Sequence, residues 1–226
     1  MAATPAERRA AEAGYAVFTP RTLALYDLVV HGLSNHLAWR CPTRHLVAHY
    51  ERHVSANHLD VGVATGLLLD RCRFPARSPR LALLDANPHC LAAAARRLAR
   101  HRPEVHRADV LAPLRLGVPP FDSIGLSYVL HCLPGPMPAK AAALDHLLPL
   151  LKPGGVLFGA TLLGRGVPRG RLARHLMAAY NARGFFANAE DDPEGLRTAL
   201  RERFPESAVR VIGCAALFAA RTKRAG

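Results

Sequence analysis

The sequence predicts an α/β protein with a doubly wound, mostly parallel sheet, helices on both faces and an antiparallel hairpin near its C-terminus. From residue 57 onward, short apolar runs alternate with amphipathic helical stretches, which is the pattern of parallel strands joined by helical crossovers. The last two apolar runs are separated only by Gly213-Cys214, a link that suits a hairpin. Half of the 226 residues are hydrophobic and 21% are charged, which excludes a disordered chain.

The expected strands are short apolar stretches, several of which end in an acidic residue or a glycine. They span residues 57–62, 80–85, 105–108, 121–128, 156–162, 208–212 and 215–220. Helices are expected over residues 66–72, from 88 to about 101, over 140–151 and within 170–204. Asn87-Pro88 marks a helix start, because Asn caps helices and Pro suits the first turn. Lys152-Pro-Gly-Gly155 predicts a tight turn before the fifth strand.

Residues 1–56 are expected to form an added helical segment in front of a domain at residues 57–226. The first 20 residues mix acidic and basic side chains and lack the apolar stretch of a secretory signal. No uncharged apolar run reaches the roughly 18 residues that span a bilayer. The five cysteines are an odd set without a C-x-x-C pair, which is typical of reduced thiols. We therefore expect a cytoplasmic protein with no membrane association.

The chain is strongly basic, with 30 Lys+Arg against 17 Asp+Glu and a formal net charge of +13. Taken alone, this excess suggests nucleic acid or another anionic partner. Only Lys140, Lys152 and Lys223 are lysines, so the other 27 cations are arginines. A chain rich in Arg and Ala but poor in Lys is equally well explained by codon composition, so the charge by itself does not decide the function.

The residues that follow the strands point to a nucleoside-like ligand, because ligands of open parallel sheets bind beyond the carboxyl ends of the strands. The first strand leads into Asp60-Val-Gly62-Val-Ala64-Thr-Gly66, whose small residues let a ligand approach the backbone. Asp85, 25 residues beyond Asp60, suits a ribose diol, and Asp109 suits an exocyclic amine. The spacing lacks the G-x-G-x-x-G fingerprint, which disfavours a dinucleotide-dependent oxidoreductase.

Taken in order, Asp60-x-Gly62-x-Ala64-x-Gly66, Asp85, Asp109-Val110, Phe121-Asp122 and Lys152-Pro-Gly-Gly155 resemble the class I S-adenosylmethionine-dependent methyltransferases of the small-molecule type. The resemblance covers roughly residues 55–221. It implies a Rossmann-like seven-stranded sheet, an N-terminal lid and S-adenosyl-L-methionine as the cofactor. Ala64 departs from the family, which usually has glycine there, and a single extra methyl should be tolerated.

The resemblance also implies which residues contact the cofactor. The loop from Asp60 to Gly66 would lie along the methionine part, Asp85 would take the ribose hydroxyls, and Asp109 would meet the adenine edge. The predicted cofactor-binding residues are Asp60, Gly62, Ala64, Gly66, Asp85, Ala86, Asp109, Val110, Ser127 and Tyr128.

A base helps methyl transfer only when the acceptor must lose a proton, as a hydroxyl or thiol does. We expect His131, just after the fourth strand, to be that base, with Tyr26 of the N-terminal segment as a second catalytic candidate. The predicted substrate-binding residues are Trp39, Arg40, Tyr180, Asn181 and Phe185.

No metal is expected. His45, His49 and His53 are spaced along one helical edge, but they border a buried apolar stripe and no acidic cluster accompanies them.

The leading prediction is a methyltransferase that acts on an O, S or N atom of a small molecule in specialised metabolism. An RNA or protein methyltransferase using the basic surface is the alternative. Against it, residues 127–131 lack the Asn/Asp-Pro-Pro-aromatic pattern of enzymes that methylate exocyclic amines of nucleic acids. A non-catalytic cofactor-binding subunit is an alternative of another class, and the intact acids and glycine loop argue against it. The identity of the acceptor and the oligomeric state stay open.

Overall fold

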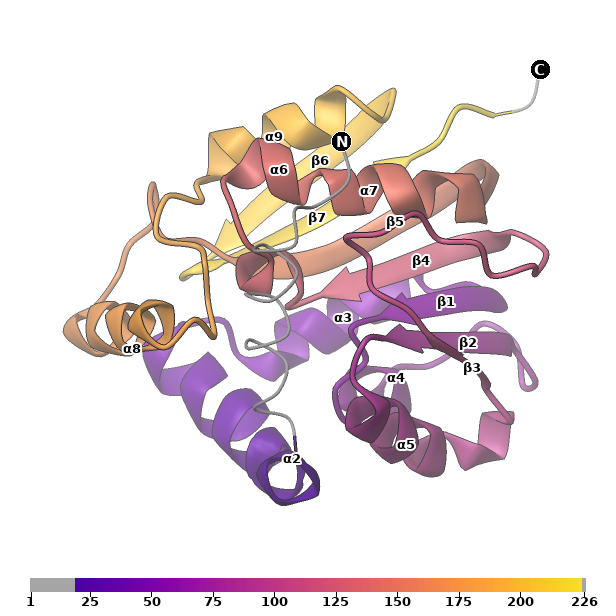
Figure 1. Ribbon diagram of the computed structural model, residues 1–226, viewed down its shortest axis with the longest axis horizontal. Helices are drawn as coiled ribbons and strands as arrows, with labels where there is room; N and C mark the ends of the chain where they lie inside the picture. Colours follow the sequence, from indigo (N-terminus) through magenta and orange to yellow (C-terminus); the bar gives the residue numbers. More distant parts are fainter. Residues whose placement is uncertain (1–18, 225–226) are drawn as a thin grey trace.

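The computed structural model describes residues 19–224, which form a seven-stranded sheet with helices on both faces (Figure 1). The strand order is β3-β2-β1-β4-β5-β7-β6. The pairs β1–β2, β1–β4, β2–β3 and β4–β5 are parallel, whereas β7 runs antiparallel to β5 and β6. The predicted doubly wound, mostly parallel sheet with a C-terminal antiparallel hairpin is therefore confirmed.

The strands lie close to their predicted positions. They are β1 (Asn57–Val61), β2 (Arg80–Asp85), β3 (Glu104–Arg107), β4 (Phe121–Ser127), β5 (Leu151–Leu162), β6 (Glu206–Ile212) and β7 (Ala215–Arg221). One difference concerns Lys152-Pro-Gly-Gly155, which belongs to an irregular first part of β5 rather than to a separate turn. The register against β4 shifts between Phe121 and Ser123 there, because Pro153 has no amide hydrogen for the ladder.

The helices follow the prediction less closely than the strands do. They are α2 (Pro20–Tyr26), the π-helix η1 (Asp27–Ala38), α3 (Thr43–His53), α4 (Leu67–Arg71), α5 (Pro88–Arg97), α6 (Met137–Lys140), α7 (Ala142–Leu147), α8 (Arg171–Ala182) and α9 (Pro193–Arg201), with short 3₁₀ turns η2 (Ala99–His101), η3 (Leu130–Cys132) and η4 (Leu148–Leu150). Asn87 caps α5 as predicted, since its side chain accepts a hydrogen bond from the His89 amide at 2.8 Å.

Two stretches predicted as continuous helix are interrupted, and the helical region predicted within 170–204 holds two helices. The helix predicted from residue 88 ends at Arg97 and is followed by a 3₁₀ turn. The stretch 140–151 breaks into α6, α7 and η4, where Pro149 removes a helical hydrogen bond. Residues 183–192 separate α8 from α9. Residues 1–18 of the predicted N-terminal segment lie outside the described residues.

The alternation of side chains along the strands divides the core into two layers. Leu81 and Leu83 of β2 pack with α3, α4 and α5, whereas Ala82 and Leu84 pack with α6, α7 and α9 on the opposite face. Because both faces are covered, the central strands are apolar on both sides. No helix within residues 19–224 is both long and apolar enough to cross a membrane.

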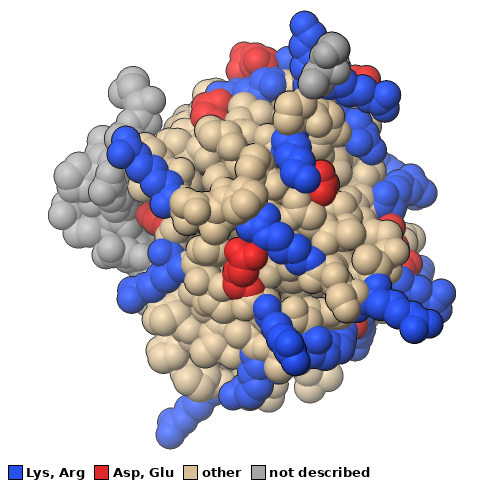
Figure 2. All heavy atoms as spheres, turned by 90° about the vertical axis from the view of Figure 1, so that its right-hand side faces the viewer, with Lys and Arg blue, Asp and Glu red and all other residues tan. Residues whose placement is uncertain are grey.

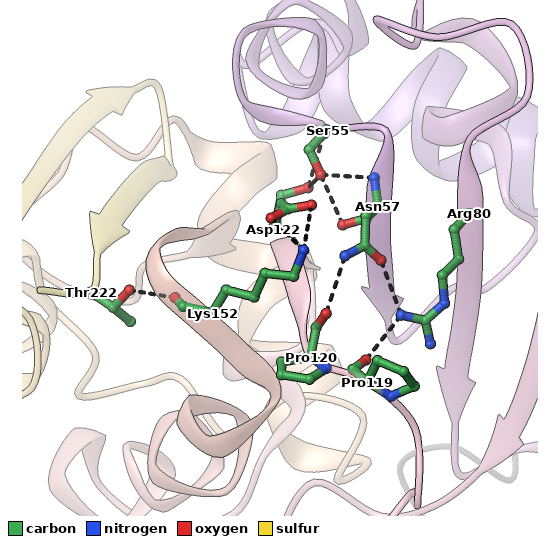
Figure 3. Close-up of polar contacts among 9 residues, drawn as sticks. Ser55, Asn57, Arg80, Pro119, Pro120, Asp122, Lys152 and Thr222 are labelled. Atoms are coloured by element: carbon green, nitrogen blue, oxygen red, sulfur yellow. Dashed lines mark hydrogen bonds and ion pairs between the residues drawn. The ribbon is translucent and has the colours of Figure 1, made fainter. Parts of the chain in front are cut away.

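Polar contacts hold together the edge of the sheet where the parallel strands begin (Figure 3). The Arg80 guanidinium, at the start of β2, donates to Asn57 Oδ1 at 3.1 Å and to the Pro119 carbonyl at 2.9 Å. Lys152 Nζ lies 3.0 Å from Asp122 Oδ1, which joins the starts of β4 and β5. These contacts occupy one edge of the sheet and leave the opposite, carboxyl edge to the loops that carry the predicted site.

A buried ion pair fixes the loop that precedes α9. Lys140 Nζ lies 2.5 Å from Asp191 Oδ2 and donates to the Ala187 carbonyl at 2.8 Å. Both ionic side chains are almost fully buried. Burial lowers the pKa of Lys140 and raises the pKa of Asp191, and the attraction between them opposes both shifts. Each side chain is therefore stable as an ion only while the other is present.

We expect Lys140→Met to lower the free energy of unfolding by about 3 kcal/mol, because it leaves Asp191 buried without its partner. Urea denaturation at pH 7 measures this change. Lys152→Met is the matched control, since its ion pair with Asp122 is about half exposed, and it should cost about 1 kcal/mol or less. Equal losses for the two variants would contradict the structural role of the buried pair.

Candidate active site

A cavity opens at the carboxyl ends of β1, β2 and β4. It contains about 1070 Å³ of empty space, part of which is open solvent at its mouth. From β1 the chain continues to β2 and β3 on one side, whereas β4 and β5 lie on the other. The strand order thus reverses between β1 and β4, and a crevice forms at such a reversal.

The structure brings the predicted cofactor-binding residues together in this cavity. All ten of them line it, and so does Tyr26. They reach it from the ends of four strands and from the helix that precedes the domain, so residues far apart in the sequence share one wall. Their individual contacts to a cofactor stay predictions.

The loop after β1 has an unusual backbone. Gly62, Ala64 and Gly66 all have positive φ angles, of 68°, 45° and 74°. A Cβ atom on Gly62 would lie 2.2 Å from Val129 Cγ2, so a larger residue cannot fit there. Ala64 adopts a left-handed conformation that costs a non-glycine residue about 1–2 kcal/mol. The family's usual glycine at this position therefore has a backbone reason, and the alanine here is accommodated with strain.

Three aspartates anchor the polar side of the cavity, and each has a structural partner. Asp60 is buried and accepts a hydrogen bond from the Tyr50 hydroxyl at 2.9 Å. Asp85 accepts one from the Asn87 amide at 2.8 Å, and Asp109 accepts one from the Leu111 amide at 2.9 Å. These bonds orient the carboxylates before any ligand arrives.

Asp85 is the carboxylate whose protonation is most affected by its surroundings. Burial raises the pKa of Asp85 to about 6, and backbone amides of Asn87, Ala64 and Val63 oppose the rise. The group is therefore ionised at neutral pH but protonated in mildly acidic solution.

The cavity is acidic although the protein is basic. Three aspartates line it and, among the described residues, no lysine or arginine does, while the whole chain carries +13. Pyrophosphate and nucleic-acid backbones are normally met by cationic side chains. A ligand that carries positive charge fits this lining instead.

His131, the predicted catalytic base, does not line the cavity. Its Nδ1 accepts a hydrogen bond from the Leu162 amide at 3.3 Å, and its ring packs on Phe186 with 4.5 Å between centroids. Burial lowers the pKa of His131 to about 3. The 3₁₀ turn η3 directs Cys132 toward the cavity and His131 toward β5. The structure places His131 outside the cavity lining, buried and packed on Phe186, so its role as the base stays a prediction that this geometry does not favour.

The predicted substrate-binding residues also lie outside the cavity lining. Trp39 is buried, with its ring 6.5 Å from that of Tyr180, and Tyr180 lies 6.2 Å from Phe185. Arg40 is exposed on the surface. These rings form an aromatic cluster that packs the N-terminal helices against α8. The cluster lies behind the residues that line the cavity.

Asn181 has a structural task as well. Its side-chain amide donates to Asn188 Oδ1 at 2.9 Å and to the Met177 carbonyl at 2.8 Å. Asn188 in turn donates to the Leu162 carbonyl at the end of β5. The asparagine pair therefore holds the loop after α8 against the sheet, which is why Asn181 is not available to the cavity.

The cavity wall also contains polar side chains that sequence reasoning missed, among them His31, Tyr50 and Cys132. Burial raises the pKa of the Cys132 thiol to about 12, so it stays protonated. His31 Nδ1 is buried without a hydrogen-bond partner among the described residues, and burial lowers the pKa of His31 to about 4. The spacing of the polar residues between 26 and 41 does not reveal which of their side chains face inward.

The three histidines of α3 lie away from this cavity. His49 Nε2 is 2.9 Å from the Phe218 carbonyl, and the His49 and His53 rings are 4.8 Å apart. Within residues 19–224 no group of three or more His, Cys, Asp or Glu side chains is arranged to hold a metal ion.

Comparison with known proteins identifies the family. Residues 59–157 match the family described as a methyltransferase domain. The chain is 42% identical to demethylluteothin O-methyltransferase of Streptomyces thioluteus over 209 residues, which cover 92% of this chain and 91% of the relative. It is 39% identical to the physcion biosynthesis cluster O-methyltransferase of Aspergillus chevalieri, with 96% of both chains covered. The chain therefore belongs to the S-adenosylmethionine-dependent methyltransferases and is an enzyme that methylates a small molecule.

Solved structures share the fold at low sequence identity. The DhpI–SAH complex superposes with a TM-score of 0.68 at 13% identity and covers 96% of this chain and 98% of its own. The N-methyltransferase NodS of Bradyrhizobium japonicum, in complex with S-adenosyl-L-homocysteine, gives 0.60 at 19% identity, with 91% and 98% covered. The sheet is thus the Rossmann-like sheet of this enzyme class.

The residues of the cavity fit S-adenosyl-L-methionine. A sulfonium and an ammonium group suit the acidic lining, and a carboxylate on a strand end suits a ribose diol. Ser127 Oγ is buried in the cavity wall with no hydrogen-bond partner among the described residues, which leaves a polar atom for the ligand. Apolar side chains beside Asp85 and Asp109, among them Leu84 and Val110, provide surfaces for an adenine ring.

We expect binding of S-adenosylmethionine to weaken by about tenfold between pH 7 and pH 5, because protonation near pH 6 removes the charge of the Asp85 carboxylate, which is predicted to accept the ribose hydroxyls. Calorimetry across this range measures the effect. Asp85→Asn should bind more weakly at pH 7 and lose the pH dependence. Wild-type affinity that stays constant from pH 7 to pH 5 would remove Asp85 from the ribose site.

Proposed function

We propose that this enzyme transfers the methyl group of S-adenosylmethionine to an acidic hydroxyl, a phenol or an enol, of a small natural product. The observation that carries the proposal is His31, whose ring lies in the cavity wall with an unpartnered nitrogen. An oxygen acceptor needs a group that receives its proton, whereas an amine attacks as the free base. The O-methyltransferases of Streptomyces thioluteus and Aspergillus chevalieri, which match most of the chain, support an oxygen acceptor.

The low pKa of His31 limits which hydroxyl is suitable. At about 4, it keeps the ring neutral and able to accept a proton at pH 7, but it also makes the ring a weak base. A phenol or an enol, whose hydroxyl is more acidic than that of an alcohol, therefore suits this base better than an alcohol does.

The other residues of the cavity bind and orient in this proposal. When bound, S-adenosylmethionine supplies a methyl group on a positively charged sulfur. Asp60 and Asp85 hold the charged and hydroxyl-bearing ends of the cofactor, and Ser127 meets it near the sulfur. Burial raises the pKa of Tyr26 well above its ordinary value, so its hydroxyl stays protonated and orients the acceptor as a hydrogen-bond donor. Asp109 and Val110 lie beside the adenine ring in this proposal.

We also assign residues 1–56 to an N-terminal lid and residues 57–226 to the cofactor-binding domain. Tyr26 and His31 support this division, because both come from the N-terminal helices and close one side of the cavity. The five free cysteines, four of them buried, support a reducing compartment such as the cytoplasm.

The alternative of an RNA acceptor has weaker support. The face at the right of Figure 1 carries many Lys and Arg side chains, but acidic and uncharged residues lie among them rather than leaving one continuous basic stripe (Figure 2). Several arginines of the chain, such as Arg80 and Arg203, are paired with nearby carboxylates. Together with the acidic cavity, this distribution favours a small acceptor.

The direct test supplies S-adenosylmethionine and demethylluteothin, and in parallel a panel of phenols, enols, alcohols and amines. We expect products that gain one methyl group by mass spectrometry, with an equal amount of S-adenosylhomocysteine formed. Transfer should be confined to phenols and enols. Transfer only to amines, or only to RNA or protein added to the same reaction, would refute the proposed acceptor class.

Two histidine variants separate the roles assigned above. We expect His31→Ala to lower kcat by about 100-fold and to change the affinity for S-adenosylhomocysteine by no more than about threefold. His131→Ala should lower the melting temperature but keep kcat near the wild-type value at 20 °C, because His131 does not line the cavity. If His131→Ala lost turnover while His31→Ala kept it, the assignment of the base would be reversed.

A further inference from the structure

A cluster of three polar side chains joins the N-terminal helices to the cofactor loop and to α5. The Thr65 hydroxyl donates to Asp27 Oδ1 at 2.5 Å, and Arg97 Nη2 donates to Asp27 Oδ2 at 2.6 Å. Arg97 Nη1 also donates to Thr65 Oγ1 at 3.1 Å. Each member contacts both others, so Asp27, Thr65 and Arg97 form a closed triangle, called the Asp27 cluster below.

The members of the Asp27 cluster come from three elements that surround the cavity. Asp27 begins the π-helix η1, and Arg97 is the last residue of α5. Thr65 belongs to the loop after β1, between Ala64 and Gly66, and lines the cavity. Asp27 directly follows Tyr26, which also lines the cavity. Together α2 and η1 form one continuous helix over residues 20–38, called the covering helix below. The Asp27 cluster therefore bonds the covering helix to the loop after β1, which holds the cofactor in the proposed site.

The covering helix has little apolar burial to hold it in place. Across residues 20–38 only Leu23, Asn35 and Ala38 are buried. Its outer face exposes large apolar side chains, which are Leu25, Leu28, Val29, Leu33 and Leu37. Because burial of apolar area is the main source of docking energy, a helix that buries so few side chains depends strongly on its polar contacts.

Two sets of polar contacts join this helix to other described parts of the chain. The Asp27 cluster forms the first. The second is Asn35, whose Oδ1 accepts a hydrogen bond from the Tyr128 hydroxyl at 2.9 Å and whose Nδ2 donates to Thr43 at 3.0 Å. His31 lies between them, one helical turn from each. The two sets of contacts therefore hold Tyr26 and His31 at the cavity from both ends.

We propose that Asp27 is a positioning residue, which acts through Thr65 and Arg97 to hold the covering helix against the cofactor loop and thereby sets how long the cofactor stays bound. The cofactor lies under this helix in the proposed site, so it leaves only after the helix moves away. The Asp27–Arg97 pair is about a quarter exposed, and a pair of this exposure is weak enough to break and re-form in each catalytic cycle. The proposal rests on the cofactor and does not depend on the acceptor.

The test measures dissociation of S-adenosylhomocysteine from the full-length protein by surface plasmon resonance. Asp27→Asn keeps the shape of the side chain but removes its charge, and we expect dissociation about tenfold faster, equivalent to about 1.4 kcal/mol. Arg97→Gln should accelerate it less, because the Asp27–Thr65 hydrogen bond persists. The double variant should be no faster than Asp27→Asn alone, since both changes remove the same interaction.

The control is Arg100→Gln. Arg100 follows α5 and pairs with Asp70 at 2.5 Å, but it does not touch the covering helix. Arg100→Gln should leave the dissociation rate within about twofold of the wild type, because the Arg100–Asp70 ion pair that it removes is similar in length to the Asp27–Arg97 pair but does not involve the covering helix. Added salt should accelerate dissociation from the wild type and not from Asp27→Asn, because salt screens an ion pair that the variant lacks.

Hydrogen exchange gives a second readout. In Asp27→Asn, amides of residues 20–38 should exchange faster than in the wild type, with β1 and β4 unchanged. Wild-type dissociation rates in both Asp27→Asn and Arg97→Gln, or an equal acceleration in Arg100→Gln, would overturn the proposal. Because the assay needs no acceptor, it can fail while O-methylation succeeds, and the reverse.

Discussion

The reversal of strand order between β1 and β4 is the constraint on which the site depends. It opens the crevice at the carboxyl edge of the sheet and brings the ends of β1, β2 and β4 to one cavity. The opposite edge is closed by contacts such as those of Arg80 with Asn57 and Pro119. Asp60 and Asp85 lie in the last residues of β1 and β2, and Asp109 follows β3, so the sheet itself brings the three carboxylates to the cavity.

Charge is distributed in opposite senses over the surface and the cavity. The chain carries +13, and yet three aspartates and no lysine or arginine line the cavity among the described residues. A sulfonium cofactor is favoured by such a lining, because its positive charge replaces the water that the carboxylates lose. The net charge of the surface therefore does not indicate which cofactor the protein binds, whereas the acidic lining of the cavity does.

The N-terminal helices α2 and η1 contribute two side chains to the wall of the cavity. Tyr26 and His31 stand on one helix, which the Asp27 cluster fastens at one end and Asn35 fastens at the other. The same helix buries few apolar side chains, so its position depends on a small number of polar bonds. A segment held in this way suits a site that must admit a cofactor, exclude water during transfer and then release the product.

The sequence by itself determined the sheet, the family and the ten residues predicted to contact the cofactor, because each follows a strand and parallel strands deliver their carboxyl ends to one edge. It could not separate His31 from His131. Both are histidines in polar surroundings. Which of the two rings reaches the cavity depends on the backbone of the π-helix η1 and of the 3₁₀ turn η3. The sequence shows no periodicity from which the directions of side chains on these two elements could be predicted. Trp39, Tyr180 and Asn181 lie outside the cavity lining, which the sequence could not reveal for the same reason. Their neighbours come from distant segments, so only tertiary packing decided that they stand behind the cavity wall and not in it.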